Sequence, residues 1–363
     1  MKKKVLIVSH SYFMLLSAIQ LKLTVLKDSD VDIIITDYSN NSNVICRNLS
    51  ETNIFHKVIH SPVKHVYKGG NLAKKVFKTL RIFENEQTVK KRFSLDTLDY
   101  DELFISTIDI IANQLFKAIK KNNNKLVCNR YEEGYSTYTI QNDYKILEKI
   151  TSLISVIDKK FAIVDSIQNL YLFDPELYVQ KNNYKLKKIP SLSRCDLELK
   201  KVINSTFGYD DTKNDFNSKY IIFEESFVVE KEPIPDYDIF KEIIEILGKE
   251  NVTLKLHPRN PQDRFSKYGY KVSTVKDVPW EIIQFNNDFR DKVLITISSG
   301  STINSKSFFE EPIRTIALFK CIKPTPRLIT PDFLVYIDRM QQKYGKGELA
   351  IPESKEQLYE ELV

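Results

Sequence analysis

Short apolar runs alternate with longer amphipathic segments along the first half of the chain. Buried strands are predicted at residues 5–9, 31–36, 54–59, 101–107 and 125–129. Apolar positions with helical spacing predict helices at 12–26 and 108–121. Strands that alternate with helices are typical of βαβ units around a parallel sheet. We therefore predict a doubly wound α/β domain over residues 1–190.

A second alternation of the same kind follows. Strands are predicted at 220–223, 252–254, 270–272, 293–297 and 313–318, and helices at 239–247 and 354–363. The intervening residues 191–218 contain polar, turn-rich sequence, which predicts a linker. A second Rossmann-like domain is therefore predicted over 219–363. Two doubly wound halves joined by a linker favour a ligand in a cleft between them.

Composition narrows the class of protein. The 363 residues, of which 42% are hydrophobic, are enough for two domains with substantial cores. The cysteines are far apart and form no CxxC or Cys/His cluster: Cys46, Cys128, Cys195 and Cys321. This spacing argues against a zinc site or a disulfide framework and favours a cytoplasmic location. The first apolar run is too short for a signal peptide, and no run is long enough to span a membrane.

The chain is mildly basic, with a formal net charge of +6. A basic stretch contains Lys74, Lys75, Lys78, Arg81, Lys90, Lys91 and Arg92. Such a stretch is either a solvated face or a peripheral contact with an anionic acceptor or the inner membrane leaflet. No zinc finger, RRM or other nucleic-acid module is recognisable, so we expect no nucleic-acid partner. The sequence leaves open whether the protein forms a homodimer.

Polar residues follow the predicted strands at the ends where open α/β sheets bind ligands. His257 and Pro258 come after the strand at 252–254, and the proline forces the chain out of the sheet. Lys255 and Arg259 flank them and would suit an anionic ligand. The alternative is a histidine in an ordinary strand-to-turn junction.

Three other motifs also follow predicted strands. Glu132, Glu133 and Gly134 place a carboxylate on a tight turn, where it can act as a base or bind a sugar. Glu224 and Glu225 follow the strand at 220–223 and are either site residues or part of a helix cap. The third motif, an anion site or a plain N-cap, consists of Ser298, Ser299, Gly300, Ser301 and Thr302.

The order of these motifs, acidic-acidic-glycine, then His-Pro, then Ser-Ser-Gly, resembles the bacterial sialyltransferases. It is similar in particular to glycosyltransferase family 52, the lipooligosaccharide and capsule sialyltransferases. The resemblance covers most of the chain in layout, while individual residues match only at the short motifs. It implies a GT-B fold and CMP-N-acetylneuraminate (CMP-Neu5Ac) as the donor, with no cofactor.

The resemblance also implies a role for each matching residue. Glu132, Glu133 and Gly134 match the acidic-acidic-glycine motif of the acceptor side, and His257 and Pro258 match the His-Pro motif. Glu281 matches the glutamate that holds the donor's ribose. Ser298 and Ser299 match the hydroxyl motif that holds the donor phosphate. The base would come from the acidic-glycine motif or from Glu224 and Glu225, where the family member compared has a Gly-Ser-Pro-Asp turn.

The implied reaction is inverting transfer of a sialyl group to a hydroxyl of an oligosaccharide or glycolipid, as in lipooligosaccharide or capsule. It needs a base for the acceptor hydroxyl and a group such as His257 for the departing phosphate. No divalent ion is required, because the leaving group carries one phosphate, and the DxD triplets at 99–101 and 236–238 are common by chance. Alternatives are a UDP-hexose or other CMP-nonulosonate donor, a nucleotide-sugar epimerase, and a non-catalytic glycan-assembly protein.

Overall fold

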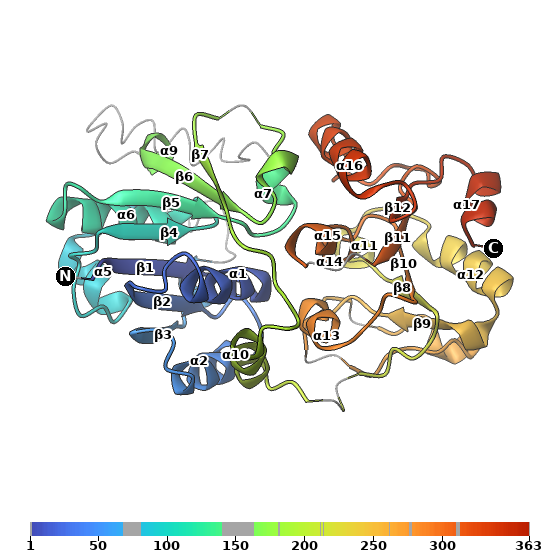
Figure 1. Cartoon of the computed structure of the whole chain (residues 1–363), viewed down its shortest axis with the longest axis horizontal. Coiled ribbons are helices and arrows are strands. Elements are labelled where there is room, and N and C mark those ends of the chain that lie inside the picture. Colours follow the sequence, from blue (N-terminus) through green and yellow to red (C-terminus); the bar gives the residue numbers. More distant parts are fainter. Residues whose placement is uncertain are drawn as a thin grey trace. The chain divides into compact units, whose positions relative to one another are not determined.

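The chain forms two compact α/β units (Figure 1). The computed structural model describes residues 2–67, 81–139, 163–180, 182–210, 212, 214–260, 262–275, 278–309 and 313–362. Unit 1 comprises Met1–Glu176, Gln180–Pro190 and Asp196–Gly208. Unit 2 comprises Leu177–Val179, Ser191–Cys195 and Tyr209–Val363.

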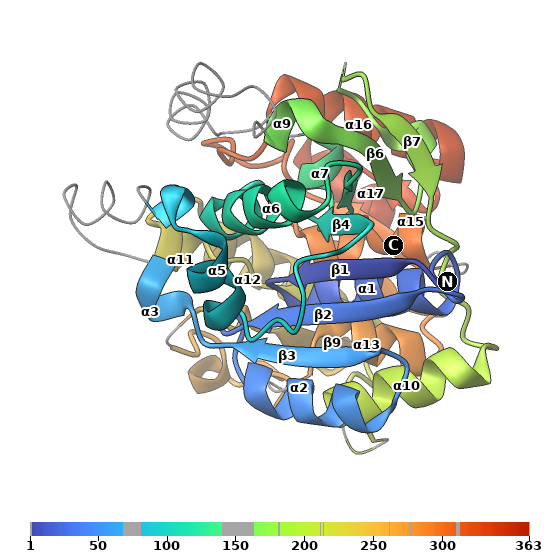
Figure 2. The same cartoon turned by 90° about the vertical axis from the view of Figure 1, so that its left-hand side faces the viewer.

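Unit 1 is built on a seven-stranded sheet with the order β3-β2-β1-β4-β5-β6-β7, in which every pair is parallel. Its strands are β1 (Lys4–Ser9), β2 (Asp30–Thr36), β3 (Lys57–Ser61), β4 (Glu102–Ile105), β5 (Val127–Tyr131), β6 (Ile167–Leu172) and β7 (Lys185–Lys188). Figure 2 shows them from β3 at the bottom to β7 at the top. The strand order reverses between β1 and β4, which is where doubly wound sheets bind ligands.

Within the described residues, helices cover the sheet of unit 1, and several of these helices begin at a side-chain cap. The described helices are α1 (Tyr12–Leu23), α2 (Ser42–Glu51), α3 (Lys64–Tyr67), α5 (Glu86–Arg92), α6 (Ile110–Asn122), α7 (Ser136–Thr139), α9 (Ile163–Ser166) and α10 (Leu197–Phe207). Ser11 caps α1 by accepting from Met14 N, and Asp109 caps α6 by accepting from Ala112 N. The core between sheet and helices includes Leu6, Leu103 and Leu115, which are fully buried.

Helix α10 lies within residues 191–218, the segment expected to be a linker. Asp196 caps it by accepting from Leu199 N at 2.9 Å, and Gly208 ends it with φ of +62°. Leu199 and Ile203 are fully buried, and α10 packs against α1 and α2. This segment is therefore partly a helix of unit 1, because its apolar face has a partner there.

Unit 2 is built on a five-stranded parallel sheet with the order β12-β11-β10-β8-β9. Its strands are β8 (Tyr220–Phe223), β9 (Val252–Lys255), β10 (Val293–Thr296), β11 (Arg314–Ala317) and β12 (Leu349–Ala350). Phe223 is in register with Lys255 on one side and Thr296 on the other, so β8, β9 and β10 end at the same level. The predicted strand at 270–272 forms only an isolated bridge, between Val272 and Leu254.

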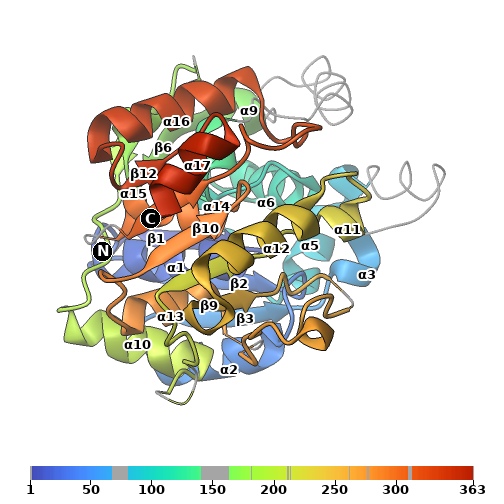
Figure 3. The same cartoon turned by 90° about the vertical axis from the view of Figure 1, so that its right-hand side faces the viewer.

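The helices of unit 2 are α11 (Phe227–Glu230), α12 (Asp236–Leu247), α13 (Trp280–Asn286), α14 (Gly300–Ile303), α15 (Ser305–Phe308), α16 (Pro331–Tyr344) and α17 (Lys355–Leu362). Helices α12 and α17 are joined by an ion pair of 2.6 Å between Lys355 and Glu242, and Figure 3 shows both helices in front. Within the described ranges, no helix is both long and apolar enough to cross a membrane.

A buried carboxyl group joins the ends of β5 and β6 in unit 1. Glu132 is fully buried, and its Oε2 accepts from the Tyr138 hydroxyl at 2.5 Å and from Phe173 N at 2.8 Å. Burial raises the pKa of Glu132 to about 8, although the two hydrogen bonds oppose the shift. The protonated form is therefore favoured by folding. Its role in the fold is to tie β5, β6 and α7 together.

Glu132→Gln is expected to remove a pH-dependent cost from folding. The pKa of Glu132 rises from 4.5 to about 8, so its stabilising contribution is complete below pH 4.5 and is lost as the pH rises through 8. Relative to wild type, the free energy of unfolding of the variant should rise by about 1.4 kcal/mol for each pH unit between pH 4.5 and about 8. Thermal unfolding across the window measures this slope.

The matched control is Glu353→Gln. Glu353 is exposed, and its hydrogen bond and ion pair with Lys320 hold its pKa below the ordinary value, so the sign is reversed. The free energy of unfolding of this variant should not rise relative to wild type as the pH rises. Equal pH slopes for wild type and Glu132→Gln would show that Glu132 is ionised in the folded protein.

Candidate active site

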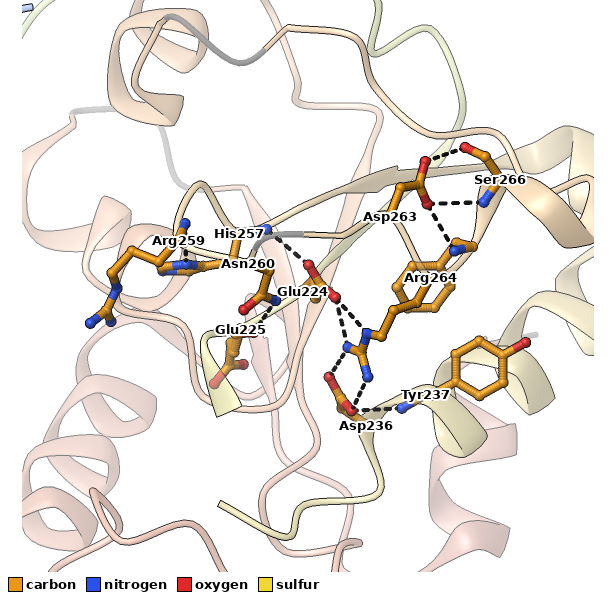
Figure 4. Close-up of polar contacts among 11 residues, drawn as sticks. Glu224, Glu225, Asp236, Tyr237, His257, Arg259, Asn260, Asp263, Arg264 and Ser266 are labelled. Carbon is orange, nitrogen blue, oxygen red and sulfur yellow. Dashed lines mark hydrogen bonds and ion pairs between the residues drawn. The ribbon is translucent and has the colours of Figure 1, made fainter. Parts of the chain in front are cut away.

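Three of the predicted motifs meet at the carboxyl edge of the sheet in unit 2. Because β8, β9 and β10 end in register, the residues that follow them are neighbours. His257 N donates to Glu224 Oε2 at 3.1 Å, and Asn260 Nδ2 donates to Glu225 O at 2.9 Å (Figure 4). On the other side, Ser298 N donates to Glu225 Oε1 at 2.6 Å. The two glutamates thus lie between the His-Pro and Ser-Ser-Gly segments.

Glu225 holds the Ser-Ser-Gly segment in place. Its carboxylate is buried and accepts from Thr296 Oγ1 at 2.8 Å and from Ser298 Oγ at 2.7 Å, in addition to Ser298 N. Burial raises the pKa of Glu225, and the hydrogen bonds from Ser298 and Thr296 oppose this shift. The Ser298 hydroxyl, expected to bind phosphate, is therefore engaged in this bond.

Glu224 holds the His-Pro segment. Its side chain is fully buried, and Oε1 accepts from Arg264 Nε at 3.0 Å and Nη2 at 2.6 Å while Oε2 accepts from His257 N. Both carboxylates at the end of β8 are thus occupied by protein donors on both oxygens. These contacts favour a positioning role for Glu224 and Glu225 over proton abstraction from a substrate.

His257 is half-buried, and its ring is held in one tautomer. Its Nδ1 accepts from Arg259 N at 3.2 Å, so in the neutral ring the proton is on Nε2. Burial, together with the charges of Arg259 and Lys255, lowers the pKa of His257 to about 4. At neutral pH the ring is therefore an uncharged donor at Nε2, and among the described residues that atom has no hydrogen-bond partner.

Lys255, Glu281 and Ser301 form a second group at this edge. Burial raises the pKa of Glu281, which is in the first turn of α13, while a hydrogen bond with the Ser301 hydroxyl and the charge of Lys255 oppose the rise. Burial likewise lowers the pKa of Lys255, and the charges of Glu281 and Asp215 oppose that shift. The expected ribose-binding glutamate is therefore close to the end of β9 and to the start of α14.

The remaining predicted residues of unit 2 differ in accessibility. Ser299, Gly300 and Ser301 are half-exposed, whereas Thr302 is buried and donates to Ser299 O at 2.9 Å. Pro258 is exposed. Arg259 is also exposed, and its Nη2 contacts Glu230 Oε1 at 2.7 Å and Ser226 Oγ at 2.8 Å. The Arg259 guanidinium is thus tied to α11.

In unit 1, only Glu133 of the acidic pair reaches the surface. It is half-buried, and its Oε2 accepts from Thr107 Oγ1 at 2.7 Å while Oε1 accepts from Ser136 Oγ at 3.2 Å. Gly134 follows with φ of +118°, a conformation that side chains disfavour, and this turns the chain into α7. Glu132, by contrast, is fully buried and ties the ends of β5 and β6 together.

A group of polar and aromatic residues around His10, at the same edge of unit 1, was not predicted. His10 follows β1, with Nδ1 2.9 Å from Thr36 Oγ1 and Nε2 3.5 Å from Asp109 Oδ2, and its ring stacks on Tyr38 at 5.3 Å. The sequence signal was available, because His10 directly follows the first strand and Asp109 stands at the start of a predicted helix. Together with Thr107, these residues surround the switch point between β1 and β4.

The basic stretch is only partly a free surface. Lys74, Lys75 and Lys78 lie outside the described residues. Arg81 and Arg92 both pair with Glu84. Lys90 and Lys91 line an open hollow of about 490 Å³ together with Lys57, Gln87, Ser94, Leu95 and Asp96.

Acidic triplets do not form a metal site in the described part of the chain. Asp101 Oδ2 accepts from Lys4 N at 2.9 Å, and Asp236 pairs with Arg264 at 2.6 Å. The described residues contain no group of three or more His, Cys, Asp or Glu side chains placed to hold a metal ion.

The sequence matches no protein-family model and no curated protein. Solved structures do match. The UDP-GlcNAc 2-epimerase from Methanocaldococcus jannaschii aligns with a TM-score of 0.54 at 13% identity, over 99% of this chain and 91% of that one. Another UDP-N-acetylglucosamine 2-epimerase aligns with a TM-score of 0.54 at 15% identity, over 99% and 86%. LpCGTa in complex with UDP aligns with a TM-score of 0.54 at 9% identity, over 100% and 90%.

These alignments extend over nearly the whole chain and include both units. At such low identities they establish the fold alone. The chain has the two-domain, Rossmann-like GT-B fold, which confirms the fold class predicted from its sequence.

Proposed function

We propose that this protein is an inverting glycosyltransferase that takes a sugar from a nucleotide-activated donor bound by unit 2. The observation that carries the proposal is the neutral Nε2–H donor of His257 at the carboxyl edge of the sheet, near Lys255. LpCGTa, which has a similar fold, was solved in complex with UDP, and this supports a nucleotide ligand.

The chemistry of the unit 2 residues suits a nucleotide phosphate and ribose. Lys255 supplies a cation, and half-exposed Ser299 supplies a hydroxyl donor, while the Ser301 hydroxyl is hydrogen-bonded to Glu281. Glu281 accepts hydrogen bonds from ribose hydroxyls in this proposal. Ser298 acts indirectly, because Glu225 holds both its amide and its hydroxyl.

The leaving group is stabilised by hydrogen bonding. As the bond between the sugar and the phosphate breaks, negative charge accumulates on the phosphate oxygens, and a preorganised donor stabilises that charge. His257 serves as this donor through Nε2 and stays neutral, because its pKa is far below physiological pH. We propose that no divalent ion takes part.

The finer proposal is that the donor is CMP-Neu5Ac and the acceptor a hydroxyl of a surface oligosaccharide or glycolipid. The order of the acidic-glycine, His-Pro and Ser-Ser-Gly motifs supports it. We propose Glu133 as the base, because it is half-exposed, whereas Glu132, Glu224 and Glu225 are buried. The donors that Glu133 accepts from, Thr107 and Ser136, are hydroxyl groups near the surface. A cytoplasmic enzyme that meets a glycolipid at the inner leaflet through Lys90 and Lys91 would fit this acceptor.

The first test measures CMP release from CMP-Neu5Ac with a lactose-type acceptor and EDTA, for wild type, His257→Ala and His257→Gln. Wild type should turn over in EDTA. The alanine variant should lose roughly 100-fold or more of its kcat, the scale observed when one transition-state donor is removed. The glutamine variant should retain more activity, because its amide N–H can still donate.

The pH profile distinguishes a neutral donor from a cationic acid. Because burial lowers the pKa of His257 to about 4, its ionisation should add no pH dependence to kcat between about pH 6 and pH 8. A loss of activity with an apparent pKa near 6.5 that disappears in His257→Gln would contradict this role. Tight binding of UDP without CMP release would reject the CMP-Neu5Ac donor, and product formed without acceptor would indicate an epimerase.

The second test concerns the base. Glu133→Gln should reduce the transfer rate by about 10²- to 10⁴-fold, because the amide cannot take the acceptor proton. Donor affinity should be unchanged, since Glu133 belongs to unit 1 and the donor residues belong to unit 2. Ser136→Ala is the matched control, because it removes one hydrogen bond to Glu133 and keeps the carboxylate. Equal losses in both variants would assign Glu133 a structural role.

A further inference from the structure

Arg264 lies in the loop after β9 and connects three parts of unit 2. Its Nε and Nη2 donate to Glu224 Oε1 at 3.0 and 2.6 Å. Its Nη1 and Nη2 donate to Asp236 Oδ1 and Oδ2 at 3.1 and 2.6 Å. Figure 4 shows the guanidinium between the two carboxylates, one at the end of β8 and the other at the start of α12.

This cation compensates two buried charges. The side chains of Glu224 and Asp236 are 0% and 3% exposed, and that of Arg264 is 25% exposed. Removing one partner of a buried ion pair leaves an uncompensated charge, which is strongly unfavourable. Burial lowers the pKa of Arg264, but hydrogen bonds and charge from Asp236 and Glu224 outweigh it and raise the pKa overall. Arg264 therefore remains a cation.

The second carboxylate oxygen of Glu224, Oε2, links the Arg264 ion pairs to the His-Pro segment. While Oε1 faces Arg264, Oε2 accepts from His257 N at 3.1 Å. Pro258 has no N–H, so the amide of His257 is the last backbone donor before Arg259, whose own amide holds the imidazole Nδ1. The orientation of the ring thus depends on where Glu224 lies.

The turn that carries Arg264 is itself well held. Asp263 Oδ1 accepts from Phe265 N at 2.8 Å and from Ser266 N at 3.0 Å, and Figure 4 shows the contact with Ser266. These hydrogen bonds hold the backbone next to Arg264 in place. The planar guanidinium of Arg264 can then pair with both carboxylates.

We propose that Arg264 is a positioning residue for His257, acting through Glu224 to aim the imidazole at the leaving phosphate. This inference rests on the proposed function. Arg264 itself touches neither the donor nor the reacting atoms. Lysine should not replace it, because one ammonium cannot form the paired contacts with both carboxylates.

The test compares Arg264→Met and Arg264→Lys with a matched control, Arg314→Met. Arg314 also forms an ion pair, at 2.7 Å with Glu361, but it lies at the first residue of β11, away from the carboxyl edge. Both Arg264 variants should lose about 10- to 100-fold in kcat, the scale of a misplaced catalytic group. Arg314→Met should not.

A readout independent of turnover is the pKa of His257, followed by NMR on the full chain and assigned with His257→Ala. In folded Arg264→Met it should rise from about 4 toward 6.5, because burial is the main cause of the low value and a released segment is more solvated. The double variant Glu224→Gln with Arg264→Met should recover part of the loss. Its neutral amide needs no cation, and its carbonyl still accepts from His257 N.

The outcomes separate the two proposals. If wild type releases no CMP, the CMP-Neu5Ac donor is rejected, while the NMR titration still tests the positioning by Arg264. An unchanged His257 pKa in folded Arg264→Met, or a change equal to that in Arg314→Met, would overturn the inference. If Arg264→Met does not fold, Glu224→Ala takes its place. That variant removes the acceptor of His257 N and keeps the Arg264–Asp236 pair, so it must raise the pKa of His257 for the inference to stand.

Discussion

The burial of two adjacent carboxylates at the end of β8 is the constraint on which the edge of unit 2 depends. Strand β8 has a neighbouring strand on each side, and both Glu224 and Glu225 are buried. Their carboxylate oxygens therefore need hydrogen-bond donors from the protein in place of water. One accepts from the segment after β9 and from Arg264, and the other accepts from the segment after β10. The same bonds that remove the cost of burial fix the two segments relative to each other.

A comparable acidic pair in unit 1 is divided differently. Glu132 is fully buried and ties β5 to β6, whereas Glu133 remains half-exposed on the turn that Gly134 permits. Identical neighbours in sequence therefore have different chemistry, because successive residues at a strand end face opposite directions. A buried carboxyl group whose protonated form is favoured by folding and a half-exposed carboxyl group are separated by a single peptide bond.

The sequence predicted much of the fold because buried strands of parallel sheets are short apolar runs. The runs at 220–223 and 293–297 correspond to β8 and β10, and both acidic motifs and the His-Pro motif do follow strands. The edge strand β7, Lys185–Lys188, was not predicted, since it is exposed at all four positions and has no apolar run. Helix α10 was not predicted because polar, turn-forming residues flank it in the sequence. Its apolar face is buried only because it packs against α1 and α2 in the folded chain.

By itself, the sequence determined the alternation of strands and helices in two doubly wound halves and the positions of the His-Pro and Ser-Ser-Gly motifs at strand ends. The GT-B fold was implied by the resemblance of its motifs to a known family. Only the tertiary structure decided which of these residues are free. The parallel register of β8, β9 and β10 brings segments more than thirty residues apart within hydrogen-bonding distance. The tertiary structure therefore determined that Glu224, Glu225 and Ser298 hold each other's segments, and that His257 presents an uncharged Nε2, because burial and hydrogen-bond partners are properties of the packed chain.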